Sequence, residues 1–124
     1  MYVSLADLLD RLSIVRLKRK HGVLCDEEHS LLEREIGVAC ERASLTCEAV
    51  VSYADDLQKI NERIWDLESA IRLGKEGQLG LEEVGRRALA IRDLNRERIE
   101  VKNRLVRLSG QGFVEMKIDH ASGA

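Results

Sequence analysis

Four polar or aromatic side chains recur at intervals of four, three and four residues in the segment INERIWDLESAIR, so they would share one flank of a helix. They are Asn61, Trp65, Glu68 and Arg72. A later segment carries a second polar set, Arg92, Asn95, Arg98 and Lys102. The short connection between the two segments should bring the sets side by side. Cations and amides beside an indole could bind a phosphate or carboxylate group.

Two interpretations of these sets differ in their chemistry. In the first, the side chains form a sealed polar seam that fixes the register between helices. Glu68 would then be held between Arg72 and Arg92, with Asn61 and Asn95 completing the seam. In the second, the side chains line an open site for an anionic ligand. The predicted ligand-binding set is Asn61, Trp65, Glu68, Arg72, Arg92, Asn95, Arg98 and Lys102. Since such stripes are usually structural, the sealed seam is the preferred interpretation.

A second candidate site lies in the segment HGVLCDEEH, where potential metal ligands surround about one turn. These are His21, Cys25, Asp26 and His29. A zinc site normally has four well-spaced ligands, often with a paired C-x-x-C element, and that element is absent here. We therefore predict no metal site, and no other pattern in the chain predicts a catalytic residue or a cofactor.

The bulk composition argues against several broad classes of function. The chain has 124 residues and a formal net charge of −2, which gives no reason to expect a nucleic-acid partner. No apolar run reaches the ~18 residues of a membrane span, and no basic start followed by an apolar block suggests a signal peptide. Cys25, Cys40 and Cys47 are interpreted as free thiols. We expect a cytoplasmic protein with no membrane or nucleic-acid partner.

Hydrophobic periodicity predicts an all-α fold with three helices, at about 4–20, 27–73 and 81–108. Ser4 and Asp7 have the spacing of a capping box at the start of the first helix. A heptad pattern that continues from Leu32 to Ile71 favours one long central helix. The predicted architecture is an elongated antiparallel helical hairpin with an additional N-terminal helix.

The predicted helices form a single domain over residues 1–112, followed by a partly extended or mobile tail at 113–124. A hairpin of this kind is too thin to bury the central stretch VACERASLTCEAVVSYA, which is apolar or small on several sides. Either another copy covers this stretch or the long helix bends near 44–52. We favour the first and expect a homo-oligomer, with a dimer favoured, that assembles into a helical bundle. Its predicted interface comprises Ala39, Ala43, Thr46, Cys47, Val50 and Tyr53.

Three stretches, SLADLLDRLSIVRLKRKHG, INERIWDLESAIRLGKEG and GRRALAIRDLNRERIEVKN, resemble a family of small all-helical bacterial proteins of unknown function. Members of that family are often encoded near glycosyltransferases in surface-polysaccharide gene clusters. The residues that carry the resemblance are Asn61, Trp65, Glu68, Arg72, Asn95, Arg98 and Lys102. The resemblance implies a link to surface-polysaccharide synthesis and no particular activity.

These observations favour a self-associating accessory or interaction module without catalysis, which could also bind a protein partner. The alternative is a small enzyme or binding protein that uses the polar stripe for a phosphate- or carboxylate-bearing ligand.

Overall fold

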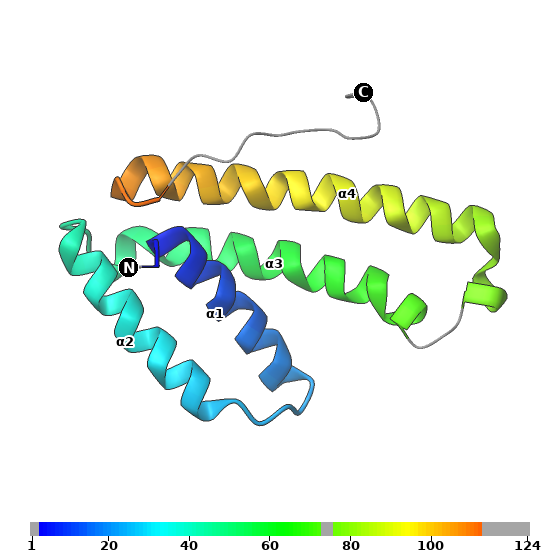
Figure 1. Ribbon diagram of the computed structural model, residues 1–124, viewed down its shortest axis with the longest axis horizontal. Coiled ribbons are helices and arrows are strands. Elements are labelled where there is room, and N and C mark those ends of the chain that lie inside the picture. Colours follow the sequence, from blue (N-terminus) through cyan, green and yellow to red (C-terminus); the bar gives the residue numbers. More distant parts are fainter. Residues whose placement is uncertain (1–2, 73–75, 113–124) are drawn as a thin grey trace.

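The computed structural model describes the backbone of residues 3–72 and 76–112 and the side chains of residues 3–69 and 80–112. The chain is all-α, as predicted, and the described residues contain no strand. The helices are α1 (Leu5–Lys20), α2 (Asp26–Arg42), α3 (Cys47–Arg72) and α4 (Glu76–Ser109). α3 and α4 lie side by side along the longest axis, and α1 lies between α2 and this pair (Figure 1).

The first helix begins and ends where the sequence predicts. The Ser4 hydroxyl caps it by accepting a hydrogen bond from the backbone N–H of Asp7 at 3.2 Å and donating one to the Asp7 carboxylate at 3.1 Å. At the other end, Gly22 has a φ of +84°, which suits the left-handed residue that follows many helices. The backbone N–H of Val23 then donates to the carbonyl of Lys18 at 2.9 Å and closes the helix end.

The predicted continuous helix over 27–73 is wrong, because the chain reverses between α2 and α3. Ser44 adopts a left-handed conformation with a φ of +55°. The N–H of Leu45 donates to the Cys40 carbonyl at 2.9 Å, which is the hydrogen bond that terminates a helix in this way. Thr46 then caps α3, because its hydroxyl accepts a hydrogen bond from the N–H of Ala49 at 3.3 Å.

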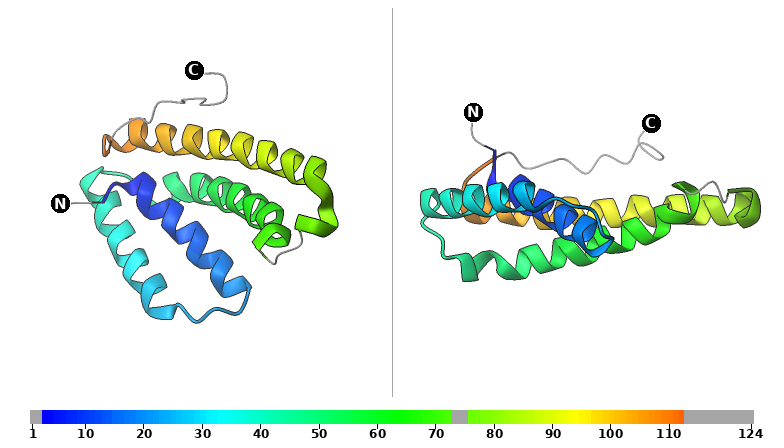
Figure 2. Two further views of the ribbon diagram at one scale, coloured as in Figure 1. Left: turned by 45° about the vertical axis from the view of Figure 1, so that its right-hand side comes forward. Right: turned by 90° about the horizontal axis from the view of Figure 1, so that it is seen from below.

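The reversal makes α1 the most enclosed helix. α2, α3 and α4 all pack against α1, and Figure 2 shows that the start of α3 lies to one side of α1 and α4. The largest side chains with almost no exposure are Leu5, Leu9, Leu17, Leu57 and Leu105. The core-facing apolar side chains of the predicted long helix, such as Leu32, Ile36, Val50 and Leu57, are therefore covered within one chain and need no second copy for their burial.

The last helix is longer than the predicted 81–108. It begins at Glu76 and bends at Gly80, whose φ of +77° and ψ of 157° are not helical. After its end, the Gln111 side chain accepts a hydrogen bond from the N–H of Leu5 at 3.1 Å and donates one to the Ala39 carbonyl at 2.8 Å. Gln111 thus joins the first turn of α1 to the last turn of α2. The predicted tail at 113–124 lies outside the described residues.

Candidate functional site

A buried polar cluster joins the middle of α1 to α3 and α4. The Asp10 carboxylate, on a residue that is 5% exposed, lies at its centre. The Asn61 amide donates to Asp10 Oδ1 at 3.0 Å and to the Ser13 hydroxyl at 2.7 Å. The Ser13 hydroxyl in turn donates to the Asp10 backbone carbonyl at 2.6 Å. Both hydrogens of the Asn61 amide are thereby used, which fixes its orientation.

Arg98 completes the cluster from α4. Its Nε donates to Asp10 Oδ1 at 2.9 Å and its Nη2 donates to Asp10 Oδ2 at 2.5 Å, so the pair is bidentate. Its Nη1 lies 3.4 Å from Asn95 Oδ1. Because Asp10 is occupied on both oxygens and its charge is balanced by Arg98, it holds three helices together and is not placed to abstract a proton from a ligand.

A pocket of about 310 Å³ lies beside this cluster, between α1, α3 and α4. Its lining residues are Ile14, Leu17, Asn61, Ile64, Trp65, Glu68, Asn95 and Arg98. The structure therefore brings together five of the eight residues in the predicted ligand-binding set: Asn61, Trp65, Glu68, Asn95 and Arg98. The side chain of a sixth, Arg72, lies outside the described residues.

The remaining two residues of the predicted set do not line the pocket. Lys102 forms an ion pair with Asp7 at 2.9 Å, near the start of α1. Burial alone would raise the pKa of the Asp7 carboxyl, but the hydrogen bond and charge of Lys102, with help from Ser4 and Arg11, hold it below its ordinary value of 3.8. Arg92 lies 3.6 Å from its neighbour Asp93.

The predicted bridge between Glu68 and Arg92 is not formed. Glu68 is half-buried and makes no ion pair or hydrogen bond with any side chain that the structure describes. The sequence analysis expected Glu68 to be the acid in the buried ion pair. That acid is instead Asp10, which pairs with Arg98, 88 residues later in the chain. Two residues missed by the sequence analysis, Asp10 and Ser13, therefore anchor the polar seam.

A usable sequence signal for these two residues exists. Ala6, Asp10, Ser13 and Leu17 recur at intervals of four, three and four, and all four are buried. The same spacing that marks the stripe of α3 thus also marks its counterpart on α1.

The single tryptophan of the chain forms part of the pocket wall and contacts the end of α1. The Trp65 and His21 rings are stacked, with centroids 4.7 Å apart and planes inclined by 7°. His21, which the sequence analysis considered as a metal ligand, therefore packs against the indole.

The predicted interface residues divide between the core and the surface. Ala39 and Val50 are buried within the chain, Ala43 and Tyr53 are half-buried, and Thr46 and Cys47 are exposed. The first two pack in the same core as α1 and are not available on the surface of a single chain.

The candidate metal ligands around His21 are dispersed. Cys25 Sγ lies 3.7 Å from the Val15 carbonyl, Asp26 lies 3.7 Å from Arg19, and His29 lies 3.2 Å from Glu33. Over the described part of the chain, no group of three or more His, Cys, Asp or Glu side chains could hold a metal ion. Within the same residues, no helix is both long and apolar enough to cross a membrane.

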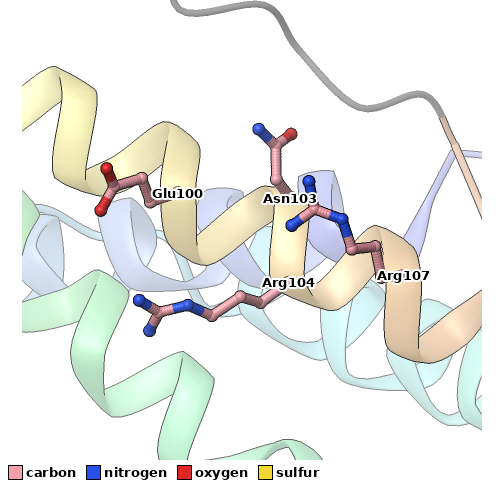
Figure 3. A pocket seen from close by; sticks show the side chains of 4 residues that line it. All are labelled: Glu100, Asn103, Arg104 and Arg107. Atoms are coloured by element: carbon pink, nitrogen blue, oxygen red, sulfur yellow. The ribbon is translucent and has the colours of Figure 1, made fainter.

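A second pocket, also of about 310 Å³, lies along α4 (Figure 3). Its described lining residues are Glu100, Asn103, Arg104 and Arg107. Figure 3 shows that the Arg104 side chain extends away from Asn103 and Arg107. These groups do not converge on one point, so the first pocket is the better-formed candidate.

Comparisons with protein-family models, with curated proteins and with solved structures found no match to this chain. Function is therefore inferred from the fold and from two of its features. One is the pocket between α1, α3 and α4, and the other is the exposed side of α2, which carries Leu31 and Val38.

Proposed function

We propose that the protein is a self-associating accessory module, acting in the cytoplasm of bacteria in connection with surface-polysaccharide synthesis, and that α2 is the helix through which two copies meet. The elongated antiparallel hairpin of α3 and α4 is then the arm that each copy extends from the dimer. The resemblance to helical proteins encoded near glycosyltransferases supports the cellular context.

The observation that carries the proposal is a row of exposed apolar side chains along α2. Leu24, Leu31 and Val38 are 94%, 51% and 42% exposed, and they are spaced by seven residues. This spacing places Leu31 and Val38 on one face of α2, and Leu24 lies two residues before the helix begins at Asp26. We call these three residues the α2 ridge.

The α2 ridge faces away from the core. The opposite side of the helix buries Leu32, Ile36, Ala39 and Cys40. α2 packs mainly against α1, so the ridge is not covered by the other helices. Exposed apolar side chains arranged in a row, rather than scattered singly, are typical of a protein contact surface.

Charge along α2 favours a second copy in the antiparallel orientation. A twofold axis at Leu31 would place Leu24 against the partner's Val38. The same axis would bring Glu28 opposite the partner's Arg34. Arg34 makes no ion pair among the residues that the structure describes, so it is available for this contact.

Sedimentation velocity or light scattering at micromolar concentration tests the proposal. The wild-type chain should be a dimer, and Leu31→Glu should make it monomeric because the change places two like charges at the twofold axis. Val51→Glu is a matched control, since Val51 is also 51% exposed but lies on α3. Circular dichroism should show unchanged helix content in both variants.

A wild-type monomer throughout this concentration range would contradict the proposal. A dimer that survives Leu31→Glu but dissociates in Val51→Glu would show that another surface, and not the α2 ridge, carries the contact.

A further inference from the structure

Among the described residues, one charged group of the pocket between α1, α3 and α4 has no partner. Arg98 lines the pocket, but its guanidinium is neutralised by the bidentate contact with the buried Asp10 carboxylate. Glu68 lines the same pocket and makes no ion pair with a described side chain. The net charge presented to a ligand is therefore negative, which opposes the anionic ligand expected from the sequence.

A half-buried carboxylate is costly unless something solvates or neutralises it. The Glu68 carboxylate is held by α3, which is already folded. A cation that enters the pocket therefore gains a charge-assisted hydrogen bond, and no entropy is lost in ordering the backbone around Glu68. The pocket thus has a chemical preference for a hydrogen-bond donor that is also positively charged.

Asn61, seven residues earlier on α3 and about 10.5 Å away along the helix axis, supplies a second acceptor to the same pocket. Its amide hydrogens are both donated, to Asp10 and to Ser13, so the Asn61 carbonyl oxygen is fixed on the opposite side of the amide group. That oxygen accepts no hydrogen bond from any residue within the described ranges. An ammonium group carries three hydrogens, so one that binds Glu68 still has hydrogens to donate to a further acceptor of the pocket.

Apart from Asn95 and Arg98, the rest of the wall is apolar. Ile14, Leu17 and Ile64 line the pocket together with the Trp65 indole. A volume of about 310 Å³ lies at the small end of ligand sites, which suits a short hydrocarbon stem and excludes a large cofactor. A stem of this kind would displace water from these side chains.

We propose that this pocket binds a small ligand with a protonated primary amine on an apolar stem, with Glu68 receiving the ammonium group, Asn61 offering a further acceptor and Trp65 contacting the stem. Asp10, Ser13 and Arg98 hold Asn61 in place and do not bind the amine themselves. The site is independent of the α2 ridge, which lies on the other side of α1.

Trp65 allows a direct test because it is the only tryptophan in the chain. Its fluorescence, and the NMR signal of its single indole N–H, should respond saturably to n-butylammonium chloride. Sodium butyrate has a similar stem with the opposite charge and should give no saturable response. Loss of one charge-assisted hydrogen bond should weaken n-butylammonium binding to Glu68→Gln by at least about tenfold.

Asp66→Asn is the matched control. Asp66 is next to Trp65, is exposed and does not line the pocket, so its variant should bind n-butylammonium like the wild type. Three results would overturn the proposal: no saturable response to n-butylammonium by either readout, binding of butyrate as tight as that of the amine, or equal amine binding by wild type and Glu68→Gln. Tighter binding of butyrate would restore the anionic-ligand interpretation.

Discussion

The Asp10 carboxylate on α1 accepts two hydrogen bonds from the Arg98 guanidinium on α4, at 2.9 and 2.5 Å. Asp10 also accepts from Asn61 on α3, so one carboxylate connects three helices. The polar stripe of α3 is therefore one part of a larger hydrogen-bond network. The charged acceptor of that network, Asp10, belongs to α1.

The first prediction concerns the stability that Asp10 contributes. Asp10→Asn removes the charge that balances Arg98 and should lower the free energy of unfolding by about 3 kcal/mol, the lower end of the range for a broken buried pair. The lower end applies because the Arg98 side chain is 31% exposed. Denaturant unfolding measures the change. Glu82→Gln breaks an exposed pair with Arg86 and should cost less than about 1 kcal/mol. Equal losses in the two variants would contradict the proposed role of Asp10.

The second prediction concerns Glu68, to which the sequence assigned the central ion pair. Because Glu68 has no partner among the described side chains, Glu68→Gln should change the free energy of unfolding by no more than about 0.5 kcal/mol. The sealed seam expected from sequence would instead give a loss of about 3–5 kcal/mol. Thermal and denaturant unfolding of this variant decide between the two arrangements without any ligand.

The third prediction concerns acid stability. Since the folded pKa of Asp7 lies below its ordinary value of 3.8, the ionised carboxylate stabilises the fold. That stabilisation is complete above pH 3.8 and is lost as the pH falls through the folded pKa. Asp7→Asn should therefore flatten the dependence of unfolding free energy on pH below about 4. Lys102→Met should have a similar effect, because it removes the main group that lowers this pKa. An unchanged pH dependence in both variants would contradict the assignment.

The fourth prediction separates the cysteines by their reactivity. Cys40 is buried, and burial, followed by the neighbouring Cys47 thiol, raises its pKa. Cys47 is exposed. Iodoacetamide at mildly alkaline pH should therefore alkylate Cys47 much faster than Cys40, because the thiolate is the reacting form. Peptide mass spectrometry over time measures the two rates, and adding denaturant should make them converge. Similar rates in the native protein would mean that Cys40 is accessible.

The sequence was sufficient to predict the helical class and the ends of α1, because capping and helix-end chemistry act over a few residues. Ser4, Asp7 and Gly22 perform locally what their types predict. The reversal between α2 and α3 was missed because the apolar register continues across it. Leu32 and Leu57 both pack in the core formed around α1, so a heptad pattern spans two helices that share one neighbour.

The candidate site was predicted in part for a related reason. Periodicity located Asn61, Trp65 and Glu68 on one flank, and they do line one pocket. It could not identify which acid pairs with which base, because this depends on how α1 packs against α3 and α4. The sequence analysis paired Glu68 with Arg72 and Arg92, and only the three-dimensional arrangement shows that the buried acid of the seam is Asp10 and that its base is Arg98.

The Gln111 side chain, which binds the N–H of Leu5 and the carbonyl of Ala39, sets an order of events during synthesis. A ribosome adds about 5–20 residues per second from the N-terminus, so α1 and α2 exist for several seconds before residue 111 is added. The Ala39 carbonyl already accepts a hydrogen bond from the Ala43 N–H at 3.1 Å. Until residue 111 is added, the Leu5 N–H has only water or another molecule to donate to. Gly112, where an added Cβ would lie 2.9 Å from Ser4 Cβ, reaches the start of α1 at the same late moment. The start of α1 therefore gains its contacts with Gln111 and Gly112 only late in translation. In a nascent chain that stalls before these residues, the Leu5 N–H would lack its Gln111 acceptor.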